Sequence, residues 1–166
     1  MQDSHLPING FSFDLHKFQN VYVLGGGKAG IEGTCRMMAI AEKAKEDDLV
    51  ICLISGCGSS LVPLLREGLS LSDKQELTNT SLKSGATISE INAVRKYLFA
   101  FKGGWLARKA YPATVLNLNL SDVVGDPLDS IASEPTVPDL STFKDAGNVL
   151  EKYVCGQMFP PVFAKS

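Results

Sequence analysis

The stretch "YVLGGGKAGIEGTC", residues 22–35, joins an apolar run, a glycine-rich turn and the start of a periodic apolar pattern. Residues 21–25, VYVLG, have the composition of a short buried strand that ends in glycine. From Ile31 onward, apolar residues recur at Cys35 and Met38 with charged residues between them, which predicts a helix over residues 31–45. The stretch therefore predicts a strand that passes through a tight turn into a helix.

Two more apolar segments, "DLVICLISG" at 48–56 and "TVLNLNL" at 114–120, predict further strands. Helices are predicted over residues 72–85, 87–101, 105–111 and 141–153, the first two opened by capping boxes at Ser72–Gln75 and Thr87–Glu90. Strands that alternate with helices indicate an α/β fold. We expect a three-layer sandwich with a small, mostly parallel, Rossmann-like sheet, in a single domain over residues 1–166. Such sheets bind ligands at the carboxyl ends of their strands.

Composition excludes several classes of function. The 166 residues carry a net charge of −2, which gives no electrostatic basis for binding nucleic acid or an acidic membrane surface. The longest apolar run, "LVICLI", is too short to cross a bilayer, and the first residues lack the pattern of a signal peptide. Four cysteines without a C-x-x-C pair indicate reduced thiols and a cytoplasmic location. Only two histidines are present, which weakens any mechanism that needs a histidine base.

The loop after the first predicted strand, "LGGGKAG", is the first candidate site. It is not a Walker A loop, because Ala29 follows the lysine. Gly25, Gly27 and Gly30 match Gly-x-Gly-x-x-Gly, but the second predicted strand ends without the acidic residue that a dinucleotide site uses. Backbone N–H groups and Lys28 could still hold an anion. A plain glycine corner with a solvated lysine is an equally good interpretation.

The loops after the second and third predicted strands are also polar. "SGCGSS", 55–60, could form a nest of N–H donors and hydroxyls for phosphate, or only a flexible turn. Cys57 in it is a candidate nucleophile, although a structurally plain small residue is the better interpretation. In "LSDVVGDP", 120–127, Asp122 and Asp126 could hold Mg²⁺, or serve only as turn residues. Three such loops on one sheet edge together favour a phosphate or nucleotide site.

Three long segments give a more specific indication: "EDDLVICLISGCGSSLVPL" at 46–64, "SGATISEINAVRKYLFAFKGGWLA" at 84–107 and "LSDVVGDPLDSIASEPTVPD" at 120–139. In order and spacing they resemble the class II glycerate kinases, the glycerate 2-kinases whose C-terminal part is the MOFRL domain. The resemblance implies ATP- and Mg²⁺-dependent phosphorylation of glycerate to 2-phosphoglycerate, in a cleft between two domains. The chain would be a partial equivalent of the N-terminal domain, without the MOFRL domain.

The resemblance also implies roles for individual residues. Catalytic roles fall on Lys28, Arg95 and Asp122, and metal binding on Asp122 and Asp126. The residues that would line the nucleotide and phosphate site are Ser55, Gly56, Gly58, Ser59, Asn92 and Lys102. Phosphoryl transfer asks mainly for positioning and for cations against the phosphate oxygens, so this set is chemically coherent.

Several positions depart from the family pattern. They are Cys57, Ser60, Tyr97, Trp105 and Glu134, where the family usually has Gly, Ala, His, Arg and Gly. The glycine–lysine turn also runs almost directly into the helix before residue 46, which suggests the loss of an internal βα segment. Kinase activity of this short chain is therefore expected to be impaired or absent. The alternative is a non-catalytic module that binds phosphate or nucleotide, or that pairs with a second copy as a homodimer.

Overall fold

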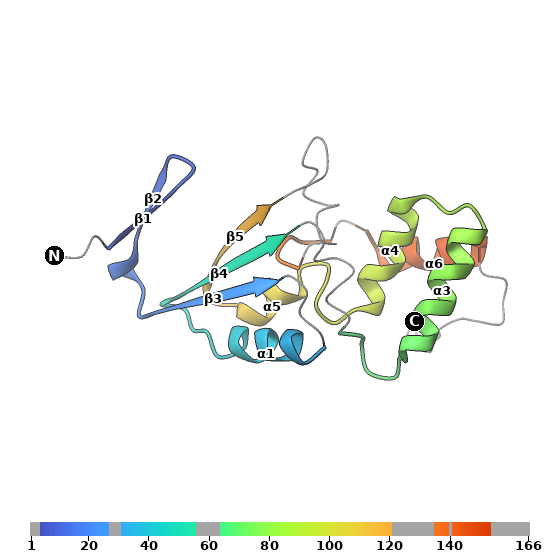
Figure 1. Ribbon diagram of the computed structural model, residues 1–166, viewed down its shortest axis with the longest axis horizontal. Coiled ribbons are helices and arrows are strands. Elements are labelled where there is room, and N and C mark those ends of the chain that lie inside the picture. Colours follow the sequence, from blue (N-terminus) through green and yellow to red (C-terminus); the bar gives the residue numbers. More distant parts are fainter. Residues whose placement is uncertain (1–3, 27–30, 56–63, 121–134, 140, 154–166) are drawn as a thin grey trace.

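The computed structural model describes residues 4–26, 31–55, 64–120, 135–139 and 141–153 (Figure 1). The strands are β1 (His5–Ile8), β2 (Phe11–Asp14), β3 (Asn20–Gly26), β4 (Asp48–Ser55) and β5 (Thr114–Leu120). The helices are α1 (Ile31–Ala41), α3 (Leu71–Lys83), α4 (Ile88–Leu98), α5 (Trp105–Ala110) and α6 (Phe143–Tyr153), with a 3-10 turn at Leu15–Lys17. Strands alternate with helices from β3 onward, which confirms the predicted α/β class.

The larger sheet has three parallel strands in the order β3-β4-β5 (Figure 1). Each of the three coincides closely with a strand predicted from the sequence. In the register, Gly26 lies beside Ile54, and Ser55 lies beside Leu120. Because the strands run in the same direction, their carboxyl ends meet at one edge of the sheet.

Asp48 anchors the opposite edge of the sheet. The residue is 1% exposed. Its carboxylate accepts hydrogen bonds from the backbone N–H of Lys45 at 2.8 Å and of Asn20 at 3.0 Å, and from the Asn20 side-chain amide at 2.8 Å. The bond from the Lys45 backbone, followed by that from the Asn20 side chain, lowers the pKa of Asp48. The carboxylate thus satisfies three donors and fixes the start of β3 beside the start of β4.

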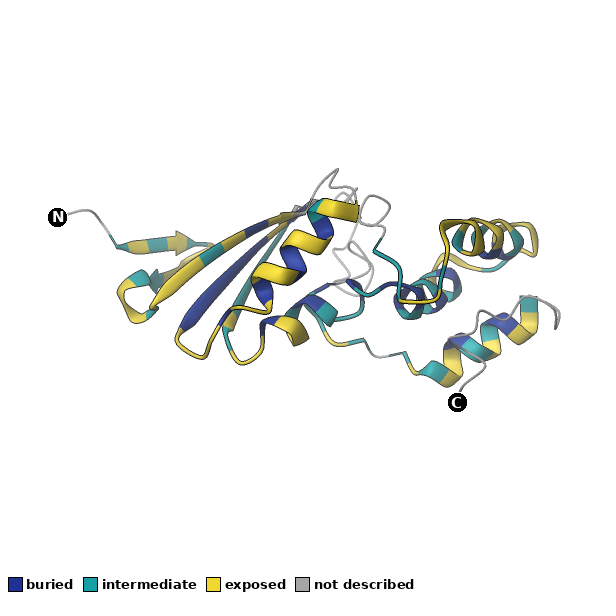
Figure 2. Ribbon diagram, turned by 90° about the horizontal axis from the view of Figure 1, so that it is seen from below, coloured by how far each residue is buried: buried dark blue, intermediate teal, exposed yellow. Residues whose placement is uncertain are grey.

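The first hydrophobic core lies between the sheet and the helices α1 and α5 (Figure 2). Successive strand residues point to opposite faces of the sheet, and those that face α1 and α5 are buried against residues of these two helices. The buried members are Leu24, Met37, Met38, Ala41, Ala44, Val50, Cys52, Ile54, Phe101, Leu106 and Ala110. On the other face, Val23 and Leu53 are 60% and 43% exposed, so no described helix covers these two positions. Of the two helical layers expected around the sheet, the described residues contain one.

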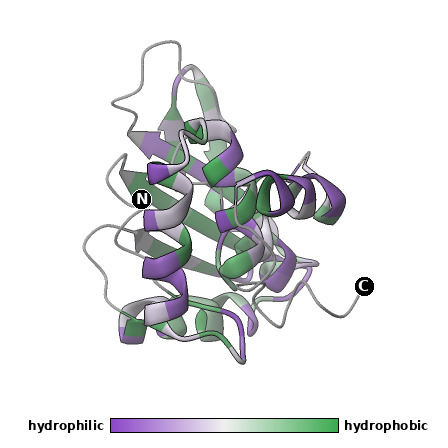
Figure 3. Cartoon of the chain, turned by 90° about the vertical axis from the view of Figure 1, so that its right-hand side faces the viewer, coloured by the Kyte–Doolittle hydropathy of each residue, from purple (hydrophilic) through white to green (hydrophobic). Residues whose placement is uncertain are grey.

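The second core joins α3, α4 and α6 beyond the carboxyl edge of the sheet (Figures 1 and 3). Its buried members are Leu77, Val94, Leu98, Phe99, Ala146 and Leu150. In Figure 3 these helices mix hydrophilic and hydrophobic residues, whereas the strands are mainly hydrophobic. Leu65 and Phe99 form an isolated antiparallel bridge, and both residues pack in this second core.

Helix boundaries differ from the sequence prediction at several ends. The N-cap of α3 is Ser70 with Asp73 as its partner, so the capping box predicted at Ser72 was two residues late. The box at Thr87 and Glu90 is confirmed. α1 ends at Ala41 rather than at residue 45, and α4 ends at Leu98 rather than at residue 101. The physical reason at α4 is that Phe99 takes an extended conformation to pair with Leu65.

The N-terminal hairpin β1–β2 was not predicted. Asn9 and Gly10 connect its strands with φ angles of 46° and 83°, the left-handed pair of a two-residue hairpin turn. The sequence carries this signal as Asn-Gly between two short apolar segments.

In the parts of the chain that the structure describes, no helix is long and apolar enough to cross a membrane.

Candidate functional site

The carboxyl edge of the three-stranded sheet brings together the starts of all three candidate loops. Ser55 is the last residue of β4 and lies beside Leu120, the last residue of β5. Gly26 ends β3 one register position away. The expected convergence of the strand ends is therefore present. The loop residues proposed as functional, Lys28, Gly56, Gly58, Ser59, Asp122 and Asp126, lie outside the described residues, as does Cys57.

A cluster of basic side chains lies beyond this edge, around Phe99. Lys102 is fully buried, with its Nζ atom 4.3 Å from the centroid of the Phe99 ring. Lys74, on α3, places its Nζ atom 5.4 Å from the same centroid. Arg95, on α4, lies close enough to both lysines to influence their titration. We name Lys74, Arg95 and Lys102 the basic cluster.

Burial and mutual repulsion together control the charge of the basic cluster. Desolvation, followed by repulsion from Arg95 and Lys74, lowers the pKa of Lys102 to about 6. Desolvation also lowers the pKa of Lys74, with Arg95 as a second cause, and the pKa of Arg95. Concentrating cations in a poorly hydrated region is unfavourable by itself. A bound anion would relieve this repulsion and favour the protonated form of Lys102.

Two of the sequence-predicted residues, Arg95 and Lys102, are thus near one another. Asn92 is partly buried and lies three positions before Arg95 on α4, which places both on the same side of the helix. Lys74 was not among the predicted residues. It comes from a helix with ordinary helical spacing, and nothing local in the sequence distinguishes it from the exposed Lys83 of the same helix.

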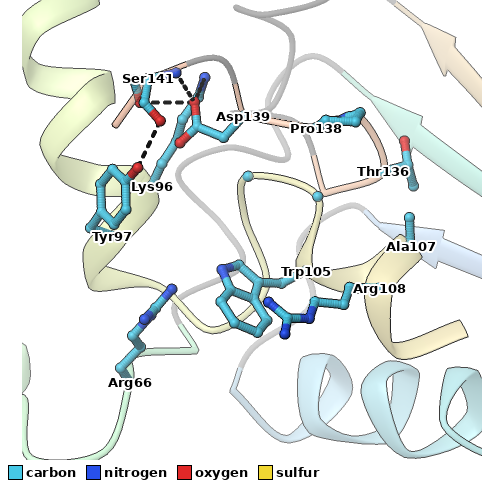
Figure 4. Close-up of a pocket in the computed structure, with 12 residues that line it drawn as sticks. Arg66, Lys96, Tyr97, Trp105, Ala107, Arg108, Thr136, Pro138, Asp139 and Ser141 are labelled. Atoms are coloured by element: carbon cyan, nitrogen blue, oxygen red, sulfur yellow. Dashed lines mark hydrogen bonds and ion pairs between the residues drawn. The ribbon is translucent and has the colours of Figure 1, made fainter. Parts of the chain in front are cut away.

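A separate cavity of about 440 Å³ lies at the junction of the two cores (Figure 4). Its walls come from α4, α5 and the segment around residues 136–141. The lining residues are Arg66, Lys96, Tyr97, Gly103, Gly104, Trp105, Ala107, Arg108, Thr136, Pro138, Asp139 and Ser141. The Cζ atoms of Arg66 and Arg108 lie 4.7 and 4.8 Å from the centroid of the Trp105 ring. None of the basic cluster lines this cavity.

Hydrogen bonds fix one wall of the cavity (Figure 4). The Nζ atom of Lys96 donates to Asp139 Oδ1 at 3.0 Å. The same oxygen accepts from the backbone N–H of Ser141 at 3.0 Å and from its hydroxyl at 2.8 Å. The Tyr97 hydroxyl donates to the Ser141 carbonyl at 2.7 Å. The sequence marks Trp105 only as a departure from the family pattern. Arg66 and Arg108 were not among the predicted residues, because they are too far apart in the chain to form a motif.

The described residues offer no ready-made metal site. No group of three His, Cys, Asp or Glu side chains in the described parts of the chain could hold a metal ion. The carboxylates predicted to bind Mg²⁺, Asp122 and Asp126, lie beyond those parts.

Comparison with known proteins finds one matching family and several similar proteins with related names. Residues 29–165 match the family described as "Domain of unknown function (DUF4147)". The chain is 53% identical to the D-glycerate 2-kinase of Thermotoga maritima over 123 residues, which are 74% of this chain and 30% of that protein. It is 48% identical to the glycerate 2-kinase of Pyrococcus horikoshii over 130 residues, 78% of this chain and 29% of that protein.

A solved structure agrees with the fold. The crystal structure of a Pyrococcus horikoshii protein superposes with a TM-score of 0.84 at 33% identity, over 99% of this chain and 47% of that one. The chain thus spans less than a third of the two curated relatives and about half of this solved chain.

Proposed function

Since the chain belongs to the DUF4147 family and corresponds to the N-terminal domain of glycerate kinases, we propose that it supplies the phosphate-binding half of a glycerate 2-kinase. The reaction would be transfer of the terminal phosphoryl group of ATP to the 2-hydroxyl of glycerate. One observation carries the proposal: three basic side chains, Lys74, Arg95 and Lys102, are gathered around Phe99 beyond the carboxyl edge of the sheet.

The basic cluster fits the polyphosphate of a nucleotide. Phosphoryl transfer depends on neutralising charge on phosphate oxygens, and cations in a low-dielectric region do this strongly. Arg95 would offer a guanidinium fork to two oxygens, and Lys102 would act as a point charge that gains its proton as the anion binds. Asn92 would add an amide donor from the same side of α4.

The remaining roles rest on the family resemblance. Lys28 would add a second cation at the glycine-rich turn, and Ser55, Gly56, Gly58 and Ser59 would hold phosphate oxygens with N–H and hydroxyl groups. Asp122 and Asp126 would hold Mg²⁺, which supplies charge neutralisation between phosphates. Asp122 would also orient the 2-hydroxyl.

Thermal unfolding with Mg-ATP, Mg-ADP and glycerate tests the proposal. Ligand at ten times its Kd stabilises a folded protein by about 1.4 kcal/mol, which corresponds to roughly 3–6 °C for a domain of this size. Arg95→Gln and Lys102→Met are expected to abolish the shift with Mg-ATP. Arg36→Gln, an exposed arginine on α1, is the matched control and should keep it. The absence of any shift at millimolar Mg-ATP would contradict nucleotide binding.

A second candidate function is self-association. Val23 and Leu53, on one face of the sheet, are 60% and 43% exposed, and β3 is an edge strand among the strands that the structure describes. Analytical ultracentrifugation would detect a dimer, and Val23→Lys should dissociate it. Leu82→Lys, at an equally exposed leucine on α3, is the control. A monomer at all concentrations would eliminate this candidate.

A further inference from the structure

Residues 135–139 connect the two helices that flank the turn between α4 and α5. At one end of this segment, the carbonyl oxygen of Pro135 accepts a hydrogen bond at 2.9 Å from the backbone N–H of Leu106, in the first turn of α5. At the other end, Asp139 forms an ion pair with Lys96, in the last turn of α4. A single short segment therefore joins the end of α4 to the start of α5.

The ion pair also packs against the turn itself. A Cβ atom added at Gly103 would lie 3.5 Å from the Cβ atoms of both Asp139 and Lys96, so the pair lies directly against the backbone of this glycine. Lys96 stands just before residues 97–102 in the chain, and Gly103 stands just after them. The contact between the ion pair and Gly103 therefore holds together the two ends of residues 97–102.

The carboxylate of Asp139 is held by three hydrogen bonds to a single oxygen (Figure 4). Its Oδ1 atom accepts from Lys96 Nζ at 3.0 Å, and from the backbone N–H and the hydroxyl of Ser141 at 3.0 and 2.8 Å. The side chains of Lys96 and Asp139 are only 10% and 13% exposed, so water screens their attraction weakly. Loss of one partner would leave a poorly hydrated charge without its counter-charge, which is unfavourable. We name Lys96, Asp139 and Ser141 the clasp.

Residues 97–102 include the two residues around which the basic cluster is built. The Phe99 ring lies beside the Nζ atoms of both Lys102 and Lys74, and Lys102 is fully buried. Placing a lysine among other cations in a poorly hydrated region is unfavourable, so a structural constraint is needed to keep the side chain there. The clasp supplies such a constraint, because it packs on Gly103, the residue directly after Lys102.

We propose that Lys96 and Asp139 are positioning residues for the basic cluster: their ion pair fixes both ends of residues 97–102 and thereby holds Lys102 beside Arg95 in the arrangement that binds phosphate. Lys96 and Asp139 act through Lys102 and do not themselves contact the nucleotide. The inference deepens the proposed function and rests on it for the bound phosphate. The placement of Lys102 by the clasp can be tested without any ligand.

The titration of Lys102 gives a readout that a merely structural residue would not move. Desolvation, with repulsion from Arg95 and Lys74, lowers the pKa of Lys102 to about 6 in the folded chain, against 10.5 for the solvated group. Between about pH 6.5 and 8.5 only the unfolded chain holds this proton, so the free energy of unfolding rises with pH. In Asp139→Asn, Lys102 is expected to reach solvent, its pKa to return toward 10.5, and the rise with pH to disappear. Urea denaturation of the full chain at several pH values measures this.

Asp48→Asn is the matched control. Asp48 is also a buried carboxylate that accepts three hydrogen bonds, but it lies at the opposite edge of the sheet. Asp48→Asn is expected to lower stability and to keep the rise with pH. The thermal shift with Mg-ATP gives the second comparison: it is expected to be lost in Asp139→Asn and kept in Asp48→Asn.

A milder variant serves if Asp139→Asn does not fold. Ser141→Ala removes one of the three bonds to the Asp139 carboxylate and leaves every charge in place. Because it loosens the clasp without breaking it, this variant is expected to raise the pH at which the free energy of unfolding begins to rise. The same onset as in the parent chain would count against the proposal.

Other outcomes overturn the proposal or separate it from the kinase role. An unchanged rise with pH in Asp139→Asn, or an equal loss in Asp48→Asn, would overturn it. A parent chain without any rise would overturn it as well, since Lys102 would then not be held in a buried place. If the parent chain shows the rise but no thermal shift with Mg-ATP, the kinase proposal fails, and loss of the rise in Asp139→Asn alone would still support the clasp.

Discussion

Lys102 Nζ lies 4.3 Å from the centroid of the Phe99 ring, with the lysine side chain fully buried and Arg95 and Lys74 close enough to repel its charge. A buried lysine among other cations is an uncommon arrangement in a structural core. Its consequences for stability and for ligand binding can be measured separately, as the following predictions show.

The stability of the chain should rise with pH between 6.5 and 8.5 because of Lys102. The pKa of this group is about 6 when folded and 10.5 when unfolded, so only the unfolded chain holds the proton in this window. Lys102→Met should remove a slope of about 1.4 kcal/mol per pH unit from the free energy of unfolding. Urea denaturation at several pH values measures it. Lys83→Met, on an exposed lysine, should keep the slope, and equal slopes in both variants would refute the assignment.

Gly104 should tolerate a side chain worse than Gly68 does. Both have φ near +80°, which costs an L-residue about 1–2 kcal/mol. A Cβ at Gly104 would also lie 2.9 Å from the Val137 carbonyl oxygen, whereas one at Gly68 would meet nothing within 4 Å. Gly104→Ala is therefore expected to destabilise the chain clearly more than Gly68→Ala in thermal unfolding. Equal losses would show that the segment at Val137 moves away freely.

The start of α3 can be tested with two serines. The Ser70 hydroxyl accepts from the Asp73 backbone N–H at 3.1 Å, and Asp73 Oδ2 accepts from the Ser70 N–H at 2.7 Å. Ser70→Ala should therefore cost about 1 kcal/mol of stability, as loss of an N-cap usually does. Ser72→Ala loses one exposed hydroxyl contact and should cost less. The reverse order in urea denaturation would place the cap where the sequence pattern had suggested.

Asp48 should contribute to stability down to acidic pH. Its pKa is lowered by hydrogen bonds from Lys45 and Asn20, so the folded chain keeps the carboxylate ionised at pH values where the unfolded chain protonates it. The contribution is complete above the unfolded value of 3.8 and is lost as pH falls through the lower folded value. Asp48→Asn should lower the thermal midpoint at pH 7. Asp47→Asn, at the exposed neighbour, should leave it nearly unchanged.

The parts of the fold that depend on local sequence were predicted well. The strands at 48–55 and 114–120 follow from short apolar runs bounded by polar residues, and the capping box at Thr87 and Glu90 follows from residues three positions apart. Errors occurred where two local patterns compete. Ser70–Asp73 and Ser72–Gln75 both fit the spacing of a capping box, and in the structure Ser70 and Asp73 make the two reciprocal bonds.

The same distinction between local and long-range contacts applies to the candidate site residues. Arg95 and Lys102 could be found from the sequence because they belong to a continuous segment with a family pattern. Lys74 could not, since it joins them only when α3 packs beside α4. Arg66 and Arg108 are separated by most of the second core, and Trp105 between them reads as an ordinary packing residue.

By itself, the sequence determined that this protein has a small parallel α/β sheet with three polar loops at one edge, because strand formation and turns depend on residues close together in the chain. Only the tertiary structure decided that Lys74 joins the buried lysine and that two arginines share one tryptophan ring. Those contacts depend on how helices pack across long stretches of chain, and the resulting burial, rather than residue identity, gives these cations their unusual electrostatic environment.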